Sequence, residues 1–330
     1  MSSSKPKGDR PPRRGKNRSG RRIPLKRRIL NSAWFHWLVA WYVRWAIGFA
    51  RLLGRRRATA LSAGFVRLVA PFIPENRVAA ANLAAAFPEK SDAERQRILK
   101  GVWDNLARTT IEFAFLDEIL DGFRIHRMDK GMVTAHGLET ALKLRGGEKP
   151  GLIFAAHLAN WELPATIAQR FGLDLTILFR MPKNSIVAED LMKRRNEMMG
   201  NLVASQLGTT FEIASALEKG SHVAMLVDQR RMGSPLLPFF GRPAATSTFF
   251  AKLAREYDCP VHGARAIRLP GGRFHVEMTP QIDLPRDGEG LIDVMAATET
   301  INEILEGWIR EHPEQWLWVH DRWRTGKPLS

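Results

Sequence analysis

The sequence predicts an α/β protein with a mostly parallel central sheet flanked by helices, preceded by an N-terminal hydrophobic membrane-associated helix. Two observations predict the α/β body. From about residue 150, apolar strand-like runs alternate with helical periods, and each apolar run is short and bounded by turn residues. A third observation, a Trp-rich apolar run near the N-terminus, predicts the membrane-associated helix.

The first 28 residues predict a disordered basic tail. They hold twelve Lys or Arg and one acid, Asp9, among many Ser, Gly and Pro. Such a composition cannot bury enough apolar surface to fold. A tail of this charge could attract nucleic acid or anionic lipid, and the apolar segment that follows favours lipid.

Residues 29–57 predict a membrane-anchoring helix. Four tryptophans recur every three or four residues and therefore share one helical face. They are Trp34, Trp37, Trp41 and Trp45. Arginines interrupt the run, so its uncharged part is shorter than the roughly 20 residues that a spanning helix needs. We expect a helix lying in the cytoplasmic leaflet, with a tilted single span and a soluble core helix as alternatives.

The remaining residues, 58–330, predict one catalytic domain that begins with helices. Helical segments over 66–86 are interrupted at Pro71-Phe-Ile-Pro74, and Ser91-Asp-Ala-Glu94 is a capping box that opens a long helix to about Leu120. Strands are then predicted at 151–156, 173–179, 221–227, 261–267 and 274–278. Helices are predicted at 161–169, 185–199, 213–219, 246–256 and 291–310.

The most informative stretch is 152–164, LIFAAHLANWELP, in which an apolar strand ends on His157. Asn160 is predicted to cap the helix at 161–169, which puts Glu162 in its first turn. We expect Glu162 to bind one ring nitrogen of His157, so that the other can accept a proton from a substrate hydroxyl. The alternative is a histidine satisfied by the helix N-terminus, with Glu162 an ordinary first-turn acid.

Three predicted strands end on polar residues, namely His157, Arg180 and Asp228. If the strands are parallel, these side chains converge on one edge of the sheet, where sites form in α/β proteins. Arg180 and Asp228 are therefore candidate substrate-binding residues, as is Asn160 beside the histidine. The alternative for the first two is a role as ion-pair partners in loops.

Two basic elements predict contacts to an anionic group. Arg242 precedes a hydroxyl-capped helix start near Thr248, and a helix N-terminus beside an arginine suits a phosphate. Lys193-Arg194-Arg195 follows Arg180 on the next helix and could face lipid phosphates. The alternatives are an ordinary strand–loop–helix junction and a solvated helix face.

Several motifs are missing from the sequence. It contains no Gly-x-Ser-x-Gly elbow, no Gly-x4-Gly-Lys phosphate loop and no Gly-x-Gly-x-x-Gly fingerprint. No His or Cys pair has zinc-ligand spacing, and the single cysteine, Cys259, excludes an intrachain disulfide. We therefore expect neither a metal nor a nucleotide cofactor.

A set of blocks along the chain carries a family resemblance. They are Asn82-Leu83, FPE (87–89), NLARTTIEF (105–113), AHLANWE (156–162), RMPKN (180–184), VDQ (227–229), PFFGRPAAT (238–246) and PEQWLWVH (313–320). With these blocks in this order, the sequence from about residue 30 onward resembles the late lipid A acyltransferases of Gram-negative bacteria. These are the lauroyl and myristoyl transferases of the lysophospholipid-acyltransferase superfamily.

The resemblance implies a catalytic His-x4-Asp/Glu motif at His157 and Glu162, substrate contacts near Arg180 and Arg195, and an N-terminal membrane anchor. The chain departs from the family in two places. Family members commonly have paired arginines after the last histidine, where this sequence has His320-Asp321-Arg322. The basic tail is not a family feature either.

We therefore expect a membrane-associated acyltransferase at the cytoplasmic face of the bacterial inner membrane. It would transfer a fatty acyl chain from acyl carrier protein to a hydroxyl of a phosphorylated glycolipid, a lipid A precursor. His157 would be the general base and Glu162 would orient it. The candidate substrate-binding residues are Asn160, Arg180, Arg195, Asp228 and Arg242.

Two alternatives remain. One is a lysophospholipid or glycolipid O-acyltransferase that uses acyl-CoA. The other is a basic nucleic-acid-binding protein driven by the tail, which would not need an α/β body with a polar edge. No nucleic-acid partner is therefore expected.

Overall fold

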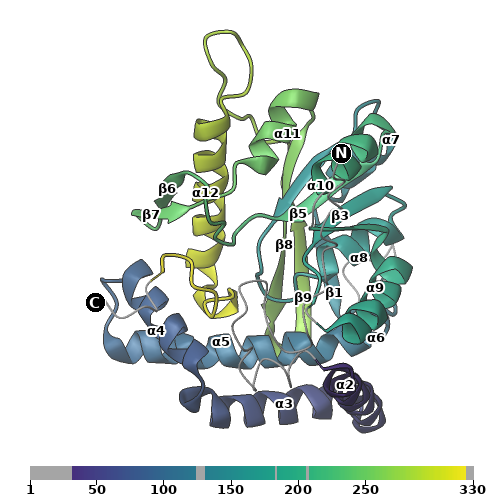
Figure 1. Ribbon diagram of the computed structural model, residues 1–330, viewed down its shortest axis with the longest axis vertical. Helices are drawn as coiled ribbons and strands as arrows, with labels where there is room; N and C mark the ends of the chain where they lie inside the picture. Colours follow the sequence, from purple (N-terminus) through teal and green to yellow (C-terminus); the bar gives the residue numbers. More distant parts are fainter. Residues whose placement is uncertain (1–31, 124–130, 183, 206–207, 325–330) are drawn as a thin grey trace, which may run out of the picture.

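A computed structural model describes residues 32–123, 131–182, 184–205 and 208–324. The predicted basic tail, 1–28, lies outside these residues. Within them, a seven-stranded sheet forms the centre of the molecule, with the strand order β1-β9-β8-β2-β5-β3-β4 (Figure 1). The strands are β1 (Val133–His136), β2 (Leu152–Ala155), β3 (Leu175–Phe179), β4 (Asn201–Ala204), β5 (His222–Leu226), β8 (Val261–Leu269) and β9 (Arg273–Met278).

The sheet confirms the predicted α/β class with a mostly parallel central sheet flanked by helices. Within this sheet, β8 and β9 pair antiparallel and the other neighbours pair parallel. The helices of this half are α7 (Leu138–Gly146), α8 (Leu163–Arg170), α9 (Ser185–Met199), α10 (Thr209–Glu218), α11 (Phe249–Tyr257) and α12 (Val294–Glu311). Strand, helix and strand thus alternate as the sequence predicts, because parallel neighbours need a crossover between them.

Alternate residues of β2 show how the two faces of the sheet are covered. Ile153 packs with Leu144 of α7 and with apolar residues of α8. Phe154 points to the other face, where its ring stacks on Trp308 of α12 at 5.7 Å between centroids and meets Phe250 of α11 edge-on at 5.8 Å. Successive side chains of a strand point to opposite faces, so both faces of β2 are buried.

The helices before the sheet form a layer at one end of it (Figure 1). They are α2 (Ala33–Leu53), α3 (Arg55–Val69), α4 (Pro74–Ala86), α5 (Asp92–Glu112) and α6 (Leu116–Ile119), with short 3₁₀ turns at Ala70–Phe72 and Phe113–Phe115. The predicted capping box at Ser91 and Glu94 is confirmed. The predicted continuous helix to Leu120 is wrong, because the backbone leaves helical geometry at Phe115, whose φ is −121°, where Phe115 turns into the core.

The predicted N-terminal helix appears as α2, but it is shorter than 29–57. It ends at Gly54, whose φ of 76° breaks the helix, so that Arg55–Arg57 begin α3 instead of flanking the apolar run. Among the described helices, none combines the length and the apolar character that crossing a membrane would require.

Short elements were missed by the sequence analysis. Besides β1 and β4, the structure contains an antiparallel hairpin of β6 (Leu236–Phe239) and β7 (Arg242–Ala245). Phe240 and Gly241 form its turn with φ values of 52° and 66°. Two successive residues with positive φ are typical of two-residue hairpin turns. Before the helix start near Thr248, the structure therefore has a hairpin, which neither the predicted anion-binding element nor the alternative of a plain junction included.

Candidate functional site

His157 and Asp228 meet at the carboxyl edge of the sheet. Ala155 of β2 pairs with Leu226 of the parallel β5, so the two polar residues lie two positions beyond a matched pair. Nδ1 of His157 lies 2.8 Å from Oδ1 of Asp228, and the backbone N–H of His157 donates to Oδ2 at 2.9 Å. The predicted convergence of strand ends is thus confirmed for these two residues.

Asp228 is held as an anion inside the protein. It is 1% exposed, and Trp316 Nε1 donates a third hydrogen bond to its Oδ2 at 2.7 Å. Burial alone would raise the pKa of Asp228, but the charge of His157 and the hydrogen bonds from His157 and Trp316 outweigh burial and lower this pKa to about 2. An ionised carboxylate can only accept, so Nδ1 of His157 carries the proton and Nε2 keeps its lone pair when the ring is neutral.

The structure does not contain the predicted contact between His157 and Glu162. Glu162 is 7% exposed and forms a two-pronged ion pair with Arg195 of α9, in which Arg195 Nε lies 3.0 Å from Oε2. Its Oε1 also accepts from Trp161 Nε1 at 3.1 Å. The reason is local: α8 begins at Leu163, later than predicted, and Glu162 is the cap residue before it, with its carboxylate bound to α9.

Asn160 also differs from its prediction. It is completely buried and does not line the cavity, so it is not placed to bind substrate. Its amide donates to Glu112 Oε2 at 3.2 Å, and its Oδ1 accepts from the backbone N–H of Glu162 at 3.3 Å. The side chain is therefore turned into the protein, because the loop bends at Ala159 with a φ of 47°.

A cavity of about 830 Å³ opens beside His157. Its polar part includes His157, Trp161, Glu162, Arg180, Arg195 and Gln229. Its apolar part extends along the sheet face that α7 and α8 cover, lined by residues such as Ile153, Ala165, Ala168, Leu175, Ala224 and Ala264. A long apolar space with polar groups at one end suits a ligand that has a hydrocarbon chain and a polar reacting group.

The three predicted arginines have different positions. Arg180 follows β3 and lines the cavity, as does Arg195, whose guanidinium is already paired with Glu162. Arg242 lies on β7, is exposed and does not line the cavity. The predicted grouping of Arg242 with a helix N-terminus is wrong, because Arg242 begins the extended strand β7 and α11 begins only at Phe249.

The sequence analysis missed residues that complete the site. Gln229 Nε2 lies 3.3 Å from His157 Nε2, on the side of the ring opposite Asp228. His320 Nε2 accepts from the backbone N–H of Arg230 at 3.0 Å and lines the cavity, and burial lowers the pKa of His320. Trp316 and His320 follow Asp228 by about ninety positions. Their place in a Trp-rich C-terminal block was visible, but not their contacts.

In the described part of the chain, no group of three or more His, Cys, Asp or Glu side chains could hold a metal ion. The arrangement around His157 is suited to proton transfer. A neutral imidazole with one nitrogen bound to a buried carboxylate and the other facing a cavity can activate a hydroxyl group.

Comparison with known proteins gives a consistent result. A family model described as bacterial lipid A biosynthesis acyltransferase matches residues 25–325. The lipid A biosynthesis palmitoleoyltransferase of Escherichia coli (strain K12) is 23% identical over 265 residues, which cover 77% of this chain and 81% of the relative. The myristoyltransferase of the same organism is 24% identical over 254 residues, 76% of each chain. Its lauroyltransferase is 24% identical over 277 residues, 80% of this chain and 84% of the relative.

Proposed function

Because this chain belongs to the bacterial lipid A biosynthesis acyltransferase family, we propose that it transfers a fatty acyl chain from acyl carrier protein to a hydroxyl of a lipid A precursor, with His157 as general base. The observation that carries the proposal is the position of His157. One ring nitrogen binds the buried carboxylate of Asp228, while the ring itself lines an apolar cavity.

The proposed reaction is a direct transfer. His157 Nε2 takes the proton from the acceptor hydroxyl while the hydroxyl oxygen attacks the thioester carbonyl. The tetrahedral intermediate then breaks its C–S bond, and the departing thiolate takes the proton from the imidazolium. Asp228 stabilises the imidazolium, since a carboxylate with a pKa of about 2 stays ionised throughout. General-base assistance of this kind contributes roughly 10²–10⁴-fold.

Gln229 and Arg180 are the proposed donors for the negative oxygen of that intermediate. Both line the cavity, and the Gln229 amide nitrogen is already within 3.3 Å of the basic nitrogen. A donor aimed at the developing charge lowers the barrier more than one aimed at the substrate ground state.

Glu162 has a different proposed role from the one that spacing predicts. Its carboxylate holds Arg195 at the cavity wall, with the two side chains 9% and 17% exposed. Arg195 and Arg180 together would bind the phosphate of a phosphorylated acceptor through their positive charges. Glu162 would set the orientation of Arg195. The two residues of the His-x4-Glu motif would then act separately. His157 would be bound by the carboxylate of Asp228, and Glu162 would bind Arg195.

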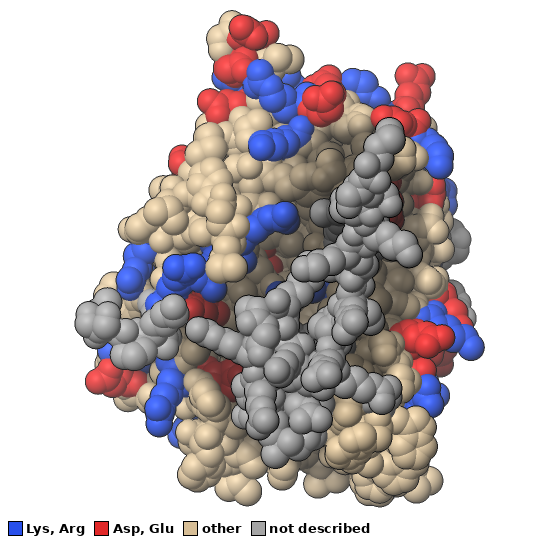
Figure 2. Space-filling view, in the orientation of Figure 1, with Lys and Arg blue, Asp and Glu red and all other residues tan. Residues whose placement is uncertain are grey.

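Membrane association is part of the proposal. The four tryptophans of α2 are 52–60% exposed, and α3 and the turn after it expose further large apolar side chains: Leu61, Phe65, Leu68 and Phe72. In Figure 2 the lower margin of the molecule, where α2 and α3 lie in Figure 1, is largely uncharged. Exposed tryptophan and flanking arginine suit the headgroup layer, so we propose interfacial binding at the cytoplasmic face of the inner membrane.

The experiment that tests this function compares donors and acceptors directly. Purified wild-type protein is expected to acylate a lipid A precursor from acyl carrier protein thioester, and His157→Ala is expected to abolish transfer while the protein still folds. Lipid A from a deletion strain should lack one acyl chain by mass spectrometry. Unchanged lipid A together with transfer from acyl-CoA to a lysophospholipid would support the alternative acceptor instead.

A further inference from the structure

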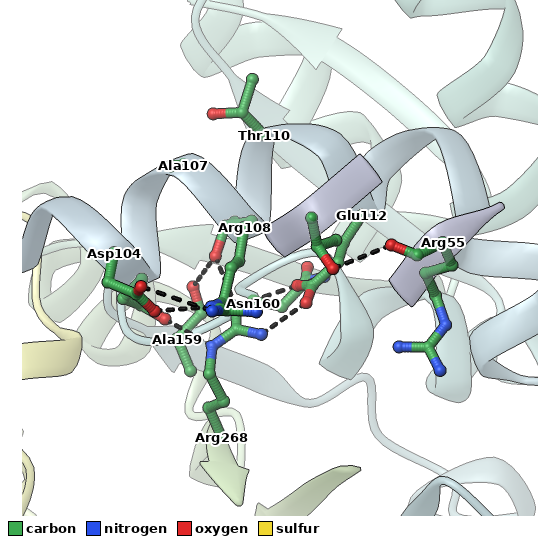
Figure 3. Close-up of polar contacts among 12 residues, drawn as sticks. Arg55, Asp104, Ala107, Arg108, Thr110, Glu112, Ala159, Asn160 and Arg268 are labelled. Atoms are coloured by element: carbon green, nitrogen blue, oxygen red, sulfur yellow. Dashed lines mark hydrogen bonds and ion pairs between the residues drawn. The ribbon is translucent and has the colours of Figure 1, made fainter. Parts of the chain in front are cut away.

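A buried polar cluster connects α5 and β8 to the loop that carries His157. Its centre is an ion pair between Glu112, at the end of α5, and Arg268 of β8, with Arg268 Nη2 2.9 Å from Glu112 Oε2 and a second contact from Nη1. The side chains are 2% and 12% exposed. Neither residue lines the cavity. Figure 3 shows the two side chains meeting beside Asn160.

The same cluster binds the backbone of the loop directly. Thr109 Oγ1, which accepts from Arg268 Nη2 at 2.9 Å, donates to the carbonyl of Ala159 at 2.9 Å. The backbone N–H of Ala159 donates to the carbonyl of Gln315 at 2.9 Å. Ala159 has a φ of 47°, a left-handed conformation that is unfavourable for alanine and persists only where surrounding contacts impose it.

Asn160 connects the cluster to the site through two hydrogen bonds. One end of its amide binds Glu112 and the other binds the backbone N–H of Glu162. His157 lies two residues before Ala159, and Glu162 lies two residues after Asn160. The cluster therefore holds both ends of the bend that lies between His157, which binds Asp228, and Glu162, which binds Arg195.

The electrostatics explain why the cluster would hold its shape. A carboxylate this deeply buried is stable only with a charged partner and further hydrogen bonds. Glu112 has both, from Arg268 and Asn160, and Arg268 Nε also donates to Asn105 Oδ1 at 2.8 Å. In a low-dielectric interior such a satisfied network resists displacement of any member.

We propose that Glu112 and Arg268 are positioning residues for acyl transfer: without touching substrate, they hold the Ala159–Asn160 bend and thereby fix His157 and Glu162 at the cavity wall. This inference rests on the proposed function of His157. It extends the functional unit beyond the cavity to the end of α5, a segment remote in sequence from the histidine.

The first test is Glu112→Gln, which keeps the size and a hydrogen-bonding end but removes the charge. We expect kcat for acyl transfer to fall roughly 10- to 100-fold, since a misplacement of about 1 Å can have an effect of this size. KM for the thioester donor should change little, because no donor-binding side chain is altered, whereas KM for the acceptor should rise modestly, because Glu162 orients Arg195. Glu118→Gln is the control: it removes the charge from a different ion pair, between α6 and Arg55 of α3 at 3.1 Å, that does not contact the loop.

A second variant separates positioning from folding. Replacing both partners by apolar residues, Glu112→Leu with Arg268→Met, should restore much of the stability lost in Glu112→Gln, because no buried charge is left alone. Its kcat should remain low, since Asn160 and Thr109 lose their partners. Folded fraction is measured by circular dichroism at the assay temperature, so that each kcat refers to folded protein.

The outcomes are distinct. Wild-type kcat in folded Glu112→Gln, or in the folded apolar pair, would overturn the positioning role. A loss of kcat in Glu118→Gln equal to that in Glu112→Gln would overturn it as well. If His157→Ala transfers acyl chains at the wild-type rate, the proposed function itself is wrong. That result does not depend on the Glu112 and Arg268 variants.

Discussion

At the scale of single residues, the sequence points to His157 as a site residue but not to the carboxylate that binds its ring. The end of an apolar strand points to His157, and the structure places its ring at the wall of the cavity. The predicted partner, Glu162, was chosen because it follows five positions later, whereas the carboxylate that binds the ring is Asp228, 71 positions away. Spacing along the chain cannot reveal a contact that two parallel strands create, although the polar ends of those strands did point to Asp228 as a site residue.

Asp228→Asn should lower kcat about 10²–10⁴-fold, because the amide cannot stabilise the imidazolium and favours the wrong tautomer. The measurement is single-turnover acyl transfer with saturating donor. Asp287→Asn is a suitable control, since it alters an aspartate in an ion pair with Arg255 at 2.6 Å, and neither residue lines the cavity. Equal rates in the two variants would rule out Asp228 as the partner of the base.

Glu162→Gln should act differently, mainly by releasing Arg195. We expect KM for the phosphorylated acceptor to rise, because a charge-assisted pair contributes about 1.5–3 kcal/mol and orients the guanidinium. KM for the thioester donor should stay nearly constant. Steady-state kinetics with each substrate varied in turn measure the difference. A large loss in kcat with unchanged acceptor KM would instead favour the direct role for Glu162 that the spacing predicted.

At the scale of elements, prediction succeeded where the pattern was long and failed where it was short. The helix over Ser185–Met199 has the predicted bounds, and the capping box at Ser91 marks the start of α5. The strands β1 and β4 were missed because, unlike the equally short β2, whose four residues are all apolar, they contain polar residues and are only partly buried. The hairpin turn at Phe240-Gly241 was missed because phenylalanine rarely adopts positive φ.

The helix α8 forms one wall of the cavity, so its small residues should limit the length of the acyl chain. Ala168→Leu adds three carbons to this wall and is expected to shift the preferred donor to a chain shorter by about two to four carbons, since a packed cavity cannot absorb the added volume. Competition between donors of different length, read by mass spectrometry, measures the shift. Gln169→Leu, at the exposed neighbouring position, should leave the preference unchanged.

The helix α2 should control binding to lipid. Trp37→Ser and Trp41→Ser are each expected to weaken vesicle binding about tenfold, equivalent to about 1.4 kcal/mol, because each removes an exposed indole suited to the headgroup layer. Co-sedimentation with vesicles containing anionic lipid measures this. Phe211→Ser changes another exposed aromatic side chain, on α10, and should bind like the wild type. Similar loss in all three variants would argue against a specific role for α2.

At the scale of the whole molecule, buried histidines link stability to pH. Burial lowers the pKa of His222, His262 and His320 below the ordinary value of 6.5. The unfolded chain therefore binds these protons at a higher pH than the native protein does. The free energy of unfolding should fall as pH drops through about 6.5, and it should change little above that value.

Urea unfolding between pH 8 and pH 5.5 measures this loss. His262→Gln should flatten the pH dependence, because one of the three titrating groups is gone. Asp228 acts in a lower window: its lowered pKa contributes stability above the ordinary range for aspartate, and that contribution is lost only as pH falls towards about 2. Stability that rises on acidification from pH 7 to pH 5.5 would contradict the assignment of these histidines as neutral.

The attachment of α2 to α9 has a consequence for how substrate could arrive. Arg44 of α2 binds Asp190 of α9 at 2.8 Å, and Asn184 beside α9 donates to the carbonyl of His36 at 3.0 Å. The same α9 presents Arg195 to the cavity. If α2 lies among lipid headgroups as proposed, a glycolipid could diffuse laterally from the bilayer into the cavity with its acyl chains still in hydrocarbon. It would then not have to cross water, as it would to reach an enzyme that is not bound to the membrane.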